Sequence, residues 1–309
     1  MITSLFRKST PFNYALVALL MLTFFFLYHF QDVNGMETLI VILQKTGLFF
    51  LLLGSLFLTN FMAKKNGLSR DSTYVVLFYF LLLLFFPSIL NNPNLLLSNF
   101  FILLALRRLI SLQSLQFPKE KIFDASAWVF LAALFHFWSI LFIILVFVSI
   151  LFHVARDYRI WLLPFLAFFS ISVLFLLFAI LFDKNAIGIL LQSTYADYNI
   201  GYFTNNYQNV AFSIFVAIAL FFLISLLLTF SSKPIIVHAS YKKIIISFFI
   251  GVAIFIISPD KSNDLLVFTF ASSAIMATSH IETTQVKLQK EIVVSVFIIC
   301  SLFTFFSQL

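Results

Sequence analysis

His136 is the histidine that lies deepest within an apolar stretch of this sequence, in the run LFHFWS at positions 134–139. A polar side chain at that depth is costly unless it faces protein or a water-filled cavity. An imidazole there can act as an acid or base near neutral pH, or it can contact a ligand. The alternative is a structural histidine that hydrogen-bonds a backbone carbonyl. Both interpretations stay open, and His136 is a candidate catalytic residue.

Arg107 and Arg108 lie inside another apolar segment, which begins near Leu95. At 1.5 Å per helical residue, Arg107 lies roughly 18 Å from that start, still within a hydrocarbon layer about 30 Å thick. An arginine at that depth needs an acceptor, and its planar guanidinium suits phosphate or carboxylate. Both arginines are therefore candidate substrate-binding residues. The alternative is that both reach the headgroups and anchor the topology.

Tyr195, Asp197 and Tyr198 lie in the longest polar connection of the chain, Asp183–Asn209. Tyrosine beside Asp and Asn can stack on and hydrogen-bond a polar ligand such as a sugar. We therefore take the tyrosines as candidate substrate-binding residues and Asp197 as a candidate catalytic carboxylate. An interfacial aromatic belt is the alternative for each tyrosine.

Three further charged residues are expected on the outer side of the membrane, together with the connection 183–209. Lys45 follows the start of the apolar segment Thr38–Met62, where it can reach outward to the membrane surface or contact a substrate anion. Asp32 and Asp260 are outward carboxylates that could act as a base beside such a site, with a solvated acid as the default.

The elements that must position these residues are apolar helices. Hydrophobic residues make up 62% of the 309 residues and charged residues 10%, whereas soluble domains average about 45–50% and about 25%. This composition excludes a soluble enzyme and a disordered chain. We predict an all-α polytopic transmembrane helical bundle that forms a single integral membrane domain over residues 1–309. The apolar segments are 12–30, 38–62, 74–90, 95–116, 125–151, 160–182, 210–230, 244–257, 264–279 and 292–308.

The basic residues set the orientation of these segments. The chain has 19 Lys and Arg against 12 Asp and Glu, and Lys and Arg in short loops mark the cytoplasmic side. We therefore expect no nucleic-acid partner. If Ala125–Leu151 crossed the membrane once, seven later cations would lie outside. If this segment instead enters and leaves on one side, sixteen cations lie inside and two outside.

This count predicts a re-entrant helical hairpin over 125–151 with arms of about 12 residues, about nine spans, a cytoplasmic N-terminus and an outward loop over 183–209. The alternative is that the charge rule fails here or that a segment boundary is misplaced. The sequence contains no phosphate-binding glycine loop, zinc-protease motif or nucleophile elbow, and its histidines are scattered. We expect no cofactor and no metal.

The segment Asn99–Ile143 resembles the central part of Wzy/EpsG-type exopolysaccharide polymerases. There, an Arg-bearing helix precedes a basic linker and a Phe-His-x-x-Ser element, which correspond here to Arg107/Arg108, Lys119/Lys121 and residues 135–139. The overall pattern is also similar to polytopic proteins of Bacteroidetes. The resemblance implies polysaccharide assembly at the bacterial cytoplasmic membrane on polyprenyl-pyrophosphate-linked sugars. It implies that Arg107 or Arg108 holds the pyrophosphate and that His136 orients or deprotonates the acceptor.

Three functional hypotheses remain. The first is a polymerase-like or glycosyltransferase-like enzyme, which predicts a cavity joining His136 to Arg107 or Arg108. The second is a non-catalytic subunit or scaffold that binds other envelope membrane proteins. The third is a transporter of lipids or small molecules, which predicts two inverted halves around a midplane site. Membrane lipid is a partner under all three.

Overall fold

The structure is a computed structural model that describes the chain except for residues 1, 30–38, 184, 200–204 and 260. All regular secondary structure in this described part is helical, which confirms the all-α prediction. Within these described residues, eight helices are long and apolar enough to cross a membrane, so a polytopic helical bundle fits the chain. The candidate carboxylates Asp32 and Asp260 lie outside the described residues.

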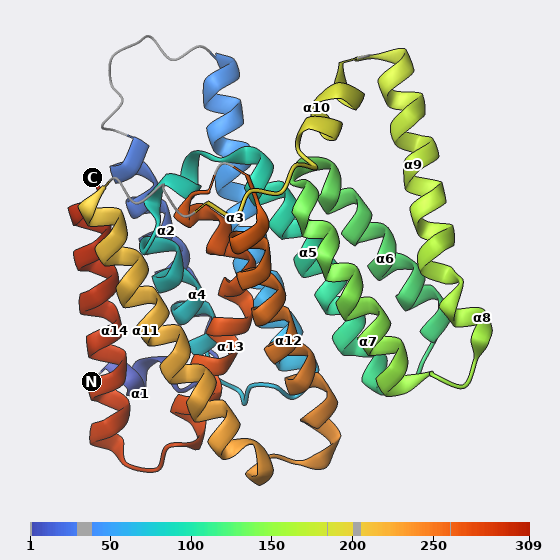
Figure 1. Cartoon of the computed structure of the whole chain (residues 1–309). Helices are drawn as coiled ribbons and strands as arrows, with labels where there is room; N and C mark the ends of the chain where they lie inside the picture. The colour runs from blue at the N-terminus through green and yellow to red at the C-terminus, as the bar shows by residue number, and fades with distance from the viewer. Residues whose placement is uncertain (1, 30–38, 184, 200–204, 260) are drawn as a thin grey trace.

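The elements follow one another along the chain as a series of antiparallel helices (Figure 1). The helices of the candidate spans are α2 (Pro11–His29), α3 (Leu39–Lys65), α5 (Pro93–Ile110), α9 (Leu163–Leu181), α11 (Asn206–Thr229), α12 (Ile235–Ile257), α13 (Val267–Thr283) and α14 (Lys287–Ser307). The shorter α-helices are α1 (Ile2–Phe6), α4 (Tyr74–Leu84), α6 (Pro118–Phe135), α7 (Ile143–His153), α8 (Tyr158–Trp161) and α10 (Ala186–Gln192). The 3₁₀ turns are η2 (Pro87–Asn91), η3 (Ser111–Ser114), η4 (Phe137–Phe142), η5 (Phe230–Ser232) and η6 (Asn263–Leu266).

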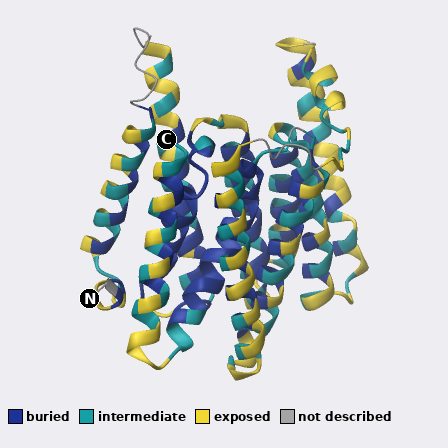
Figure 2. Ribbon diagram, turned by 60° about the vertical axis from the view of Figure 1, so that its left-hand side comes forward, coloured by how far each residue is buried: buried dark blue, intermediate teal, exposed yellow. Residues whose placement is uncertain are grey.

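Helices α4 and α13 form the centre of the bundle, where Figure 2 shows the buried residues gathered. Every residue of α4 is buried, and α13 is buried along almost its whole length. Helix α13 is rich in Ala, Ser and Thr, and small residues let helix backbones approach closely in a membrane. Gly251 of α12 is such a contact, because a Cβ built there would lie 2.7 Å from Cγ2 of Thr269.

Almost all described Lys and Arg side chains lie at one end of the bundle, which we call the basic end. Contacts tie its segments together: Tyr241 donates a hydrogen bond to the Leu68 carbonyl at 2.8 Å, and Ser72 donates one to Glu282 at 2.7 Å. The sixteen cations are Arg7, Lys8, Lys64, Lys65, Arg70, Arg107, Arg108, Lys119, Lys121, Arg156, Arg159, Lys233, Lys242, Lys243, Lys287 and Lys290.

The predicted hairpin segment is folded back on itself. Helix α6 ends at Phe135, the chain turns through His136 and η4, and α7 returns to the basic end. The two feet lie together, because Lys119 at the start of α6 forms an ion pair of 3.8 Å with Asp157, which follows α7. At its tip, Trp138 donates a hydrogen bond to the Tyr195 carbonyl, so the tip lies beside the connection between α10 and α11, at the end opposite the basic end.

Two elements differ in length from the sequence-based expectation. Helix α6 begins at Pro118 and has 18 residues, whereas the expected arm began at Ala125 and had about 12. The difference arises because the charged residues 119–121 are part of the helix. Helix α6 is therefore about 27 Å long, and the tip lies near the far end of the bundle, not at half its height. Helix α4 has only 11 residues, because Pro87 begins the separate turn η2 before residue 90.

Candidate functional site

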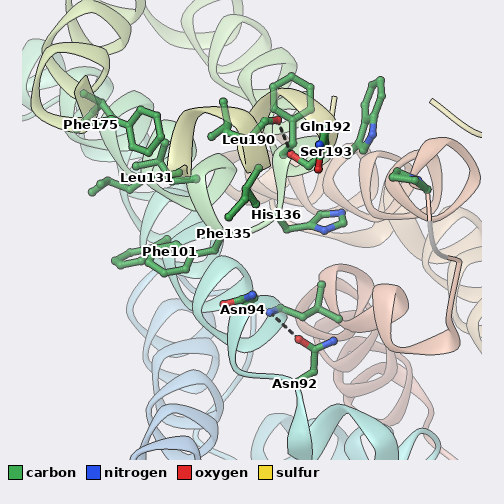
Figure 3. Close-up of a pocket in the computed structure, with 18 of the residues that line it drawn as sticks. Asn92, Asn94, Phe101, Leu131, Phe135, His136, Phe175, Leu190, Gln192 and Ser193 are labelled. Atoms are coloured by element: carbon green, nitrogen blue, oxygen red, sulfur yellow. Dashed lines mark hydrogen bonds between the residues drawn. The ribbon is translucent and has the colours of Figure 1, made fainter. Parts of the chain in front are cut away.

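The described residues form a pocket of about 980 Å³ at the tip of the hairpin, at the end of the bundle opposite the basic end. It is bounded by the start of α5, the end of α6, η4, the second half of α9, α10 and the connection after α12. Figure 3 shows His136 between the Asn92–Asn94 segment and the Gln192–Ser193 segment. The fold thus brings three connections that are distant in sequence around one histidine.

The chain holds His136 in place by ending a helix at it. Its backbone is extended, with φ −142° and ψ 105°, so the residue leaves the helical path and its ring enters the pocket lining. Nε2 lies 3.0 Å from the hydroxyl of Ser258, which is the buried residue directly after α12. The expected alternative partner was a backbone carbonyl; the partner in this structure is a side-chain hydroxyl, which can donate or accept.

Hydrogen bonds attach residues 195–197 to the hairpin tip and to the end of α12. Trp138 Nε1 donates to the carbonyl of Tyr195 at 3.3 Å, and the amide of Asp197 donates to the carbonyl of Ile257 at 3.1 Å. The ammonium of Lys261 also donates to the Asp197 carbonyl. Backbone hydrogen bonds therefore join the candidate residue Tyr195 to the hairpin tip, and the candidate residue Asp197 to the end of α12 and to Lys261.

The pocket has an apolar wall and a polar wall. Helices α6, α9 and α10 contribute to the apolar wall, and on α9 Leu174 and Phe178 are 61% and 53% exposed. The polar wall combines His136 with the side chains of Asn92, Asn94, Gln192, Ser193 and Ser262. Asp183 is the charged residue among the described lining, and no described Lys or Arg lines it. This composition fits an amphiphilic ligand with a neutral polar group.

The structure does not bring Arg107 and Arg108 to His136. Asn94 lines the pocket at the start of α5, and Arg107 lies thirteen residues further along that helix, about 20 Å away. Arg108 forms an ion pair of 2.8 Å with Asp124, and the guanidinium of Arg107 lies over the ring of Phe61. Neither arginine lines the His136 pocket, so this pocket is not the expected cavity that joins the three residues.

The remaining predicted residues lie beside the pocket or apart from it. Tyr195 lines it, whereas Tyr198 is 68% exposed and is not part of the lining. The carboxylate of Asp197 accepts a hydrogen bond from the amide of Asn199 at 2.9 Å, which is a local turn. Lys45 lies partly buried in α3 and does not line the pocket.

The sequence pattern did not indicate Asn92 and Asp183, which line the pocket, or Ser258, which contacts His136. Ser258, Asn92 and Asp183 each lie at the end of a helix, where a polar residue is the usual terminator and indicates no chemistry by itself. Asn92 indeed caps α5 by accepting a hydrogen bond from the amide of Leu95 at 3.2 Å. Only the folding of three helix ends around one cavity distinguishes these residues from ordinary caps.

Comparison with models of protein families found no match for this chain, and comparisons with curated proteins and with solved structures found none either. The functional conclusion therefore depends on the geometry of the pocket and on the chemistry of its residues.

Proposed function

We propose that this chain is a polytopic protein of the bacterial cytoplasmic membrane that binds a lipid-linked saccharide during the assembly of envelope polysaccharide. The observation that carries the proposal is the two-sided pocket at His136. Its wall of amide, hydroxyl and imidazole groups suits sugar hydroxyls, and its α9 wall suits a hydrocarbon chain. The resemblance of residues 99–143 to exopolysaccharide polymerases supports the same assignment.

The orientation of the chain in the membrane follows from the basic end. We propose that this end faces the cytoplasm, as the positive-inside rule requires, and that α6 and α7 enter and leave the membrane on that side. Helix α4 and η2 then join the eight long helices as a ninth crossing, because Thr73 contacts the Phe6 carbonyl at the basic end and Ser88 contacts Asp264 at the other. The pocket then opens at the outer side.

A sugar transfer at this site would use His136 as a base. A hydroxyl oxygen of the acceptor sugar attacks the anomeric carbon of the lipid-linked donor, and the imidazole accepts the hydroxyl proton. The bond between that carbon and the pyrophosphate oxygen breaks, and the polyprenyl pyrophosphate leaves with the electron pair. Ser258 holds the ring by its contact of 3.0 Å to Nε2. The nearest described ammonium on the adjoining connection is that of Lys261, between the lining residues Pro259 and Ser262.

A non-catalytic subunit that presents the lipid-linked saccharide to a partner protein is the second candidate. The separation of about 20 Å between the pocket and Arg107 favours it, because the basic pair that would hold a pyrophosphate is not in the same cavity. Both candidates bind the lipid-linked saccharide, but only the enzyme transfers the sugar.

The test uses the purified full chain and a radiolabelled polyprenyl-pyrophosphate oligosaccharide. Saturable binding that is lost in His136→Ala supports the proposed function, and growth of the saccharide on addition of an acceptor separates the enzyme from the subunit. No binding by a correctly folded chain, together with normal polysaccharide in cells that carry His136→Ala, would exclude the proposal.

A further inference from the structure

Two cations of the basic end lie over one aromatic ring. The guanidinium carbon of Arg107 is 5.0 Å from the centroid of the Phe61 ring, and the ammonium of Lys65 is 5.3 Å from the same centroid. Phe61 and Lys65 are one helical turn apart on α3, and Arg107 comes from α5, which packs beside α3. The ring is 43% exposed, so this cluster lies on the outer surface of the bundle.

These two cations differ from their neighbours in having no carboxylate. Arg108, the next residue, is paired with Asp124 at 2.8 Å, and Lys64 is paired with Asp71 at 3.1 Å. Among the residues that the structure describes, no Asp or Glu lies within ion-pair distance of Arg107 or Lys65. Two like charges that share a ring repel one another, and an anion between them removes that repulsion.

The surface beside the cluster is aromatic and apolar. Phe57 lies one helical turn before Phe61, and Phe50 lies two turns before Phe57, so the three rings form a stripe along one face of α3. Phe50 is 65% exposed and Phe57 is 39% exposed. A ligand whose anionic group contacts the cations would therefore have hydrocarbon beside it along α3.

We propose that Phe61, Lys65 and Arg107 form a binding site for the phosphate group of an anionic membrane lipid in the leaflet at the basic end. The guanidinium presents a planar pair of N–H groups to two phosphate oxygens, and the ammonium provides a second positive charge. The acyl chains lie along the Phe50–Phe57–Phe61 stripe. This site is separate from the His136 pocket, which lies at the opposite end of the bundle and has no described Lys or Arg in its lining.

The test measures lipid binding to the full chain, purified in a mild detergent, by native mass spectrometry with phosphatidylglycerol and phosphatidylcholine. The wild-type chain should retain phosphatidylglycerol in preference to phosphatidylcholine. The double variant Lys65→Gln/Arg107→Gln should reduce the phosphatidylglycerol affinity about thirtyfold, which corresponds to roughly 2 kcal/mol for two basic contacts. Equal retention of phosphatidylglycerol by the wild type and this variant would overturn the proposal.

A matched control removes the same charge from the same end. Arg159 and Lys242 each lie 5.8 Å from a ring of their own, Tyr158 and Phe152. The double variant Arg159→Gln/Lys242→Gln should keep the preference for phosphatidylglycerol. If this variant lost the preference, the net positive charge of the basic end would explain lipid binding without a specific site. Arg107→Lys, which keeps the charge and loses the planar fork, should weaken binding in a chain with wild-type elution and thermal stability.

Excess inorganic phosphate distinguishes a lipid site from a soluble-anion site. Phosphate at millimolar concentration should leave the bound phosphatidylglycerol in place, because the Phe50–Phe57–Phe61 stripe adds contacts that the free ion lacks. Displacement of the lipid by phosphate would overturn the assignment to a lipid. This outcome is independent of saccharide binding at His136, so either proposal can fail alone.

Discussion

His136 and Ser258 are 122 residues apart in the sequence, and their side chains meet at 3.0 Å at the tip of the helical hairpin. His136 follows the last residue of α6, and Ser258 follows the last residue of α12. The contact therefore joins two helix ends and orients the imidazole of His136 in the pocket lining.

The first prediction concerns this pair. Ser258→Ala removes the hydroxyl that holds Nε2, so we expect polysaccharide production to fall about tenfold, whereas His136→Ala should abolish it. Ser258→Thr keeps a hydroxyl and should restore part of the activity. Polymer is measured per amount of membrane-inserted protein. His238→Ala is the control, because its Nε2 lies 2.9 Å from the Lys233 carbonyl at the basic end. Full polymer from His136→Ala would contradict the assignment.

The second prediction concerns the apolar wall of the pocket. Leu174→Trp places a larger ring in the space that a hydrocarbon chain would occupy, so saccharide-lipid binding should fall at least tenfold without a loss of thermal stability. Leu177 is also on α9 and is 52% exposed, but it does not line the pocket. Leu177→Trp should bind as the wild type does. Equal effects of both substitutions would argue against a ligand along this wall.

The third prediction concerns topology. Arg156 follows α7 at the basic end, and Thr194 follows α10 at the pocket end. Single cysteines introduced at these positions in a Cys300→Ser background should react from opposite sides of the membrane, with the one at 194 accessible to an impermeant thiol reagent in intact cells. Labelling of both cysteines from one side would show that the hairpin and the outward loop are placed wrongly.

The fourth prediction concerns the close approach of α12 and α13. Gly251→Ala would place a Cβ 2.7 Å from Cγ2 of Thr269 and 3.1 Å from the backbone carbon of Phe268. We expect a loss of about 1–3 kcal/mol of stability, measured by the temperature at which the chain loses its monodisperse elution in detergent. Gly47→Ala is the control, because its Cβ would have no neighbour within 4 Å. Unchanged stability of Gly251→Ala would show that the helices can move apart at no cost.

The fifth prediction concerns the ion pair between α5 and α6. Arg108 and Asp124 are 42% and 34% exposed, so their contact of 2.8 Å should contribute only modestly to stability. A double-mutant cycle with Arg108→Gln and Asp124→Asn should give a coupling of up to about 1 kcal/mol. A much larger coupling would indicate that the pair lies out of reach of water and headgroups.

Lys and Arg positions alone determined which parts of the chain share an end. Lys119 and Arg156 could share one side only if residues 125–151 turn back. In the structure the chain turns at His136, and Lys119 forms an ion pair with Asp157, the residue after Arg156. Composition likewise sufficed for the all-helical fold, because an apolar backbone segment in a membrane satisfies its hydrogen bonds within a helix. Both inferences use properties that are local to a segment.

The composition of the pocket was decided by the tertiary structure. The sequence alone placed Arg107 and His136 in one hypothetical cavity, because helices that begin at Leu95 and Ala125 would bring both residues to a similar height in the membrane. That height depends on where each helix begins: α5 at Pro93 carries Arg107 to the basic end, and α6 from Pro118 carries His136 to the other. Asn92 lines the pocket and Ser258 contacts His136 because helices of different lengths end at one level. Local sequence patterns do not encode this relationship between distant segments.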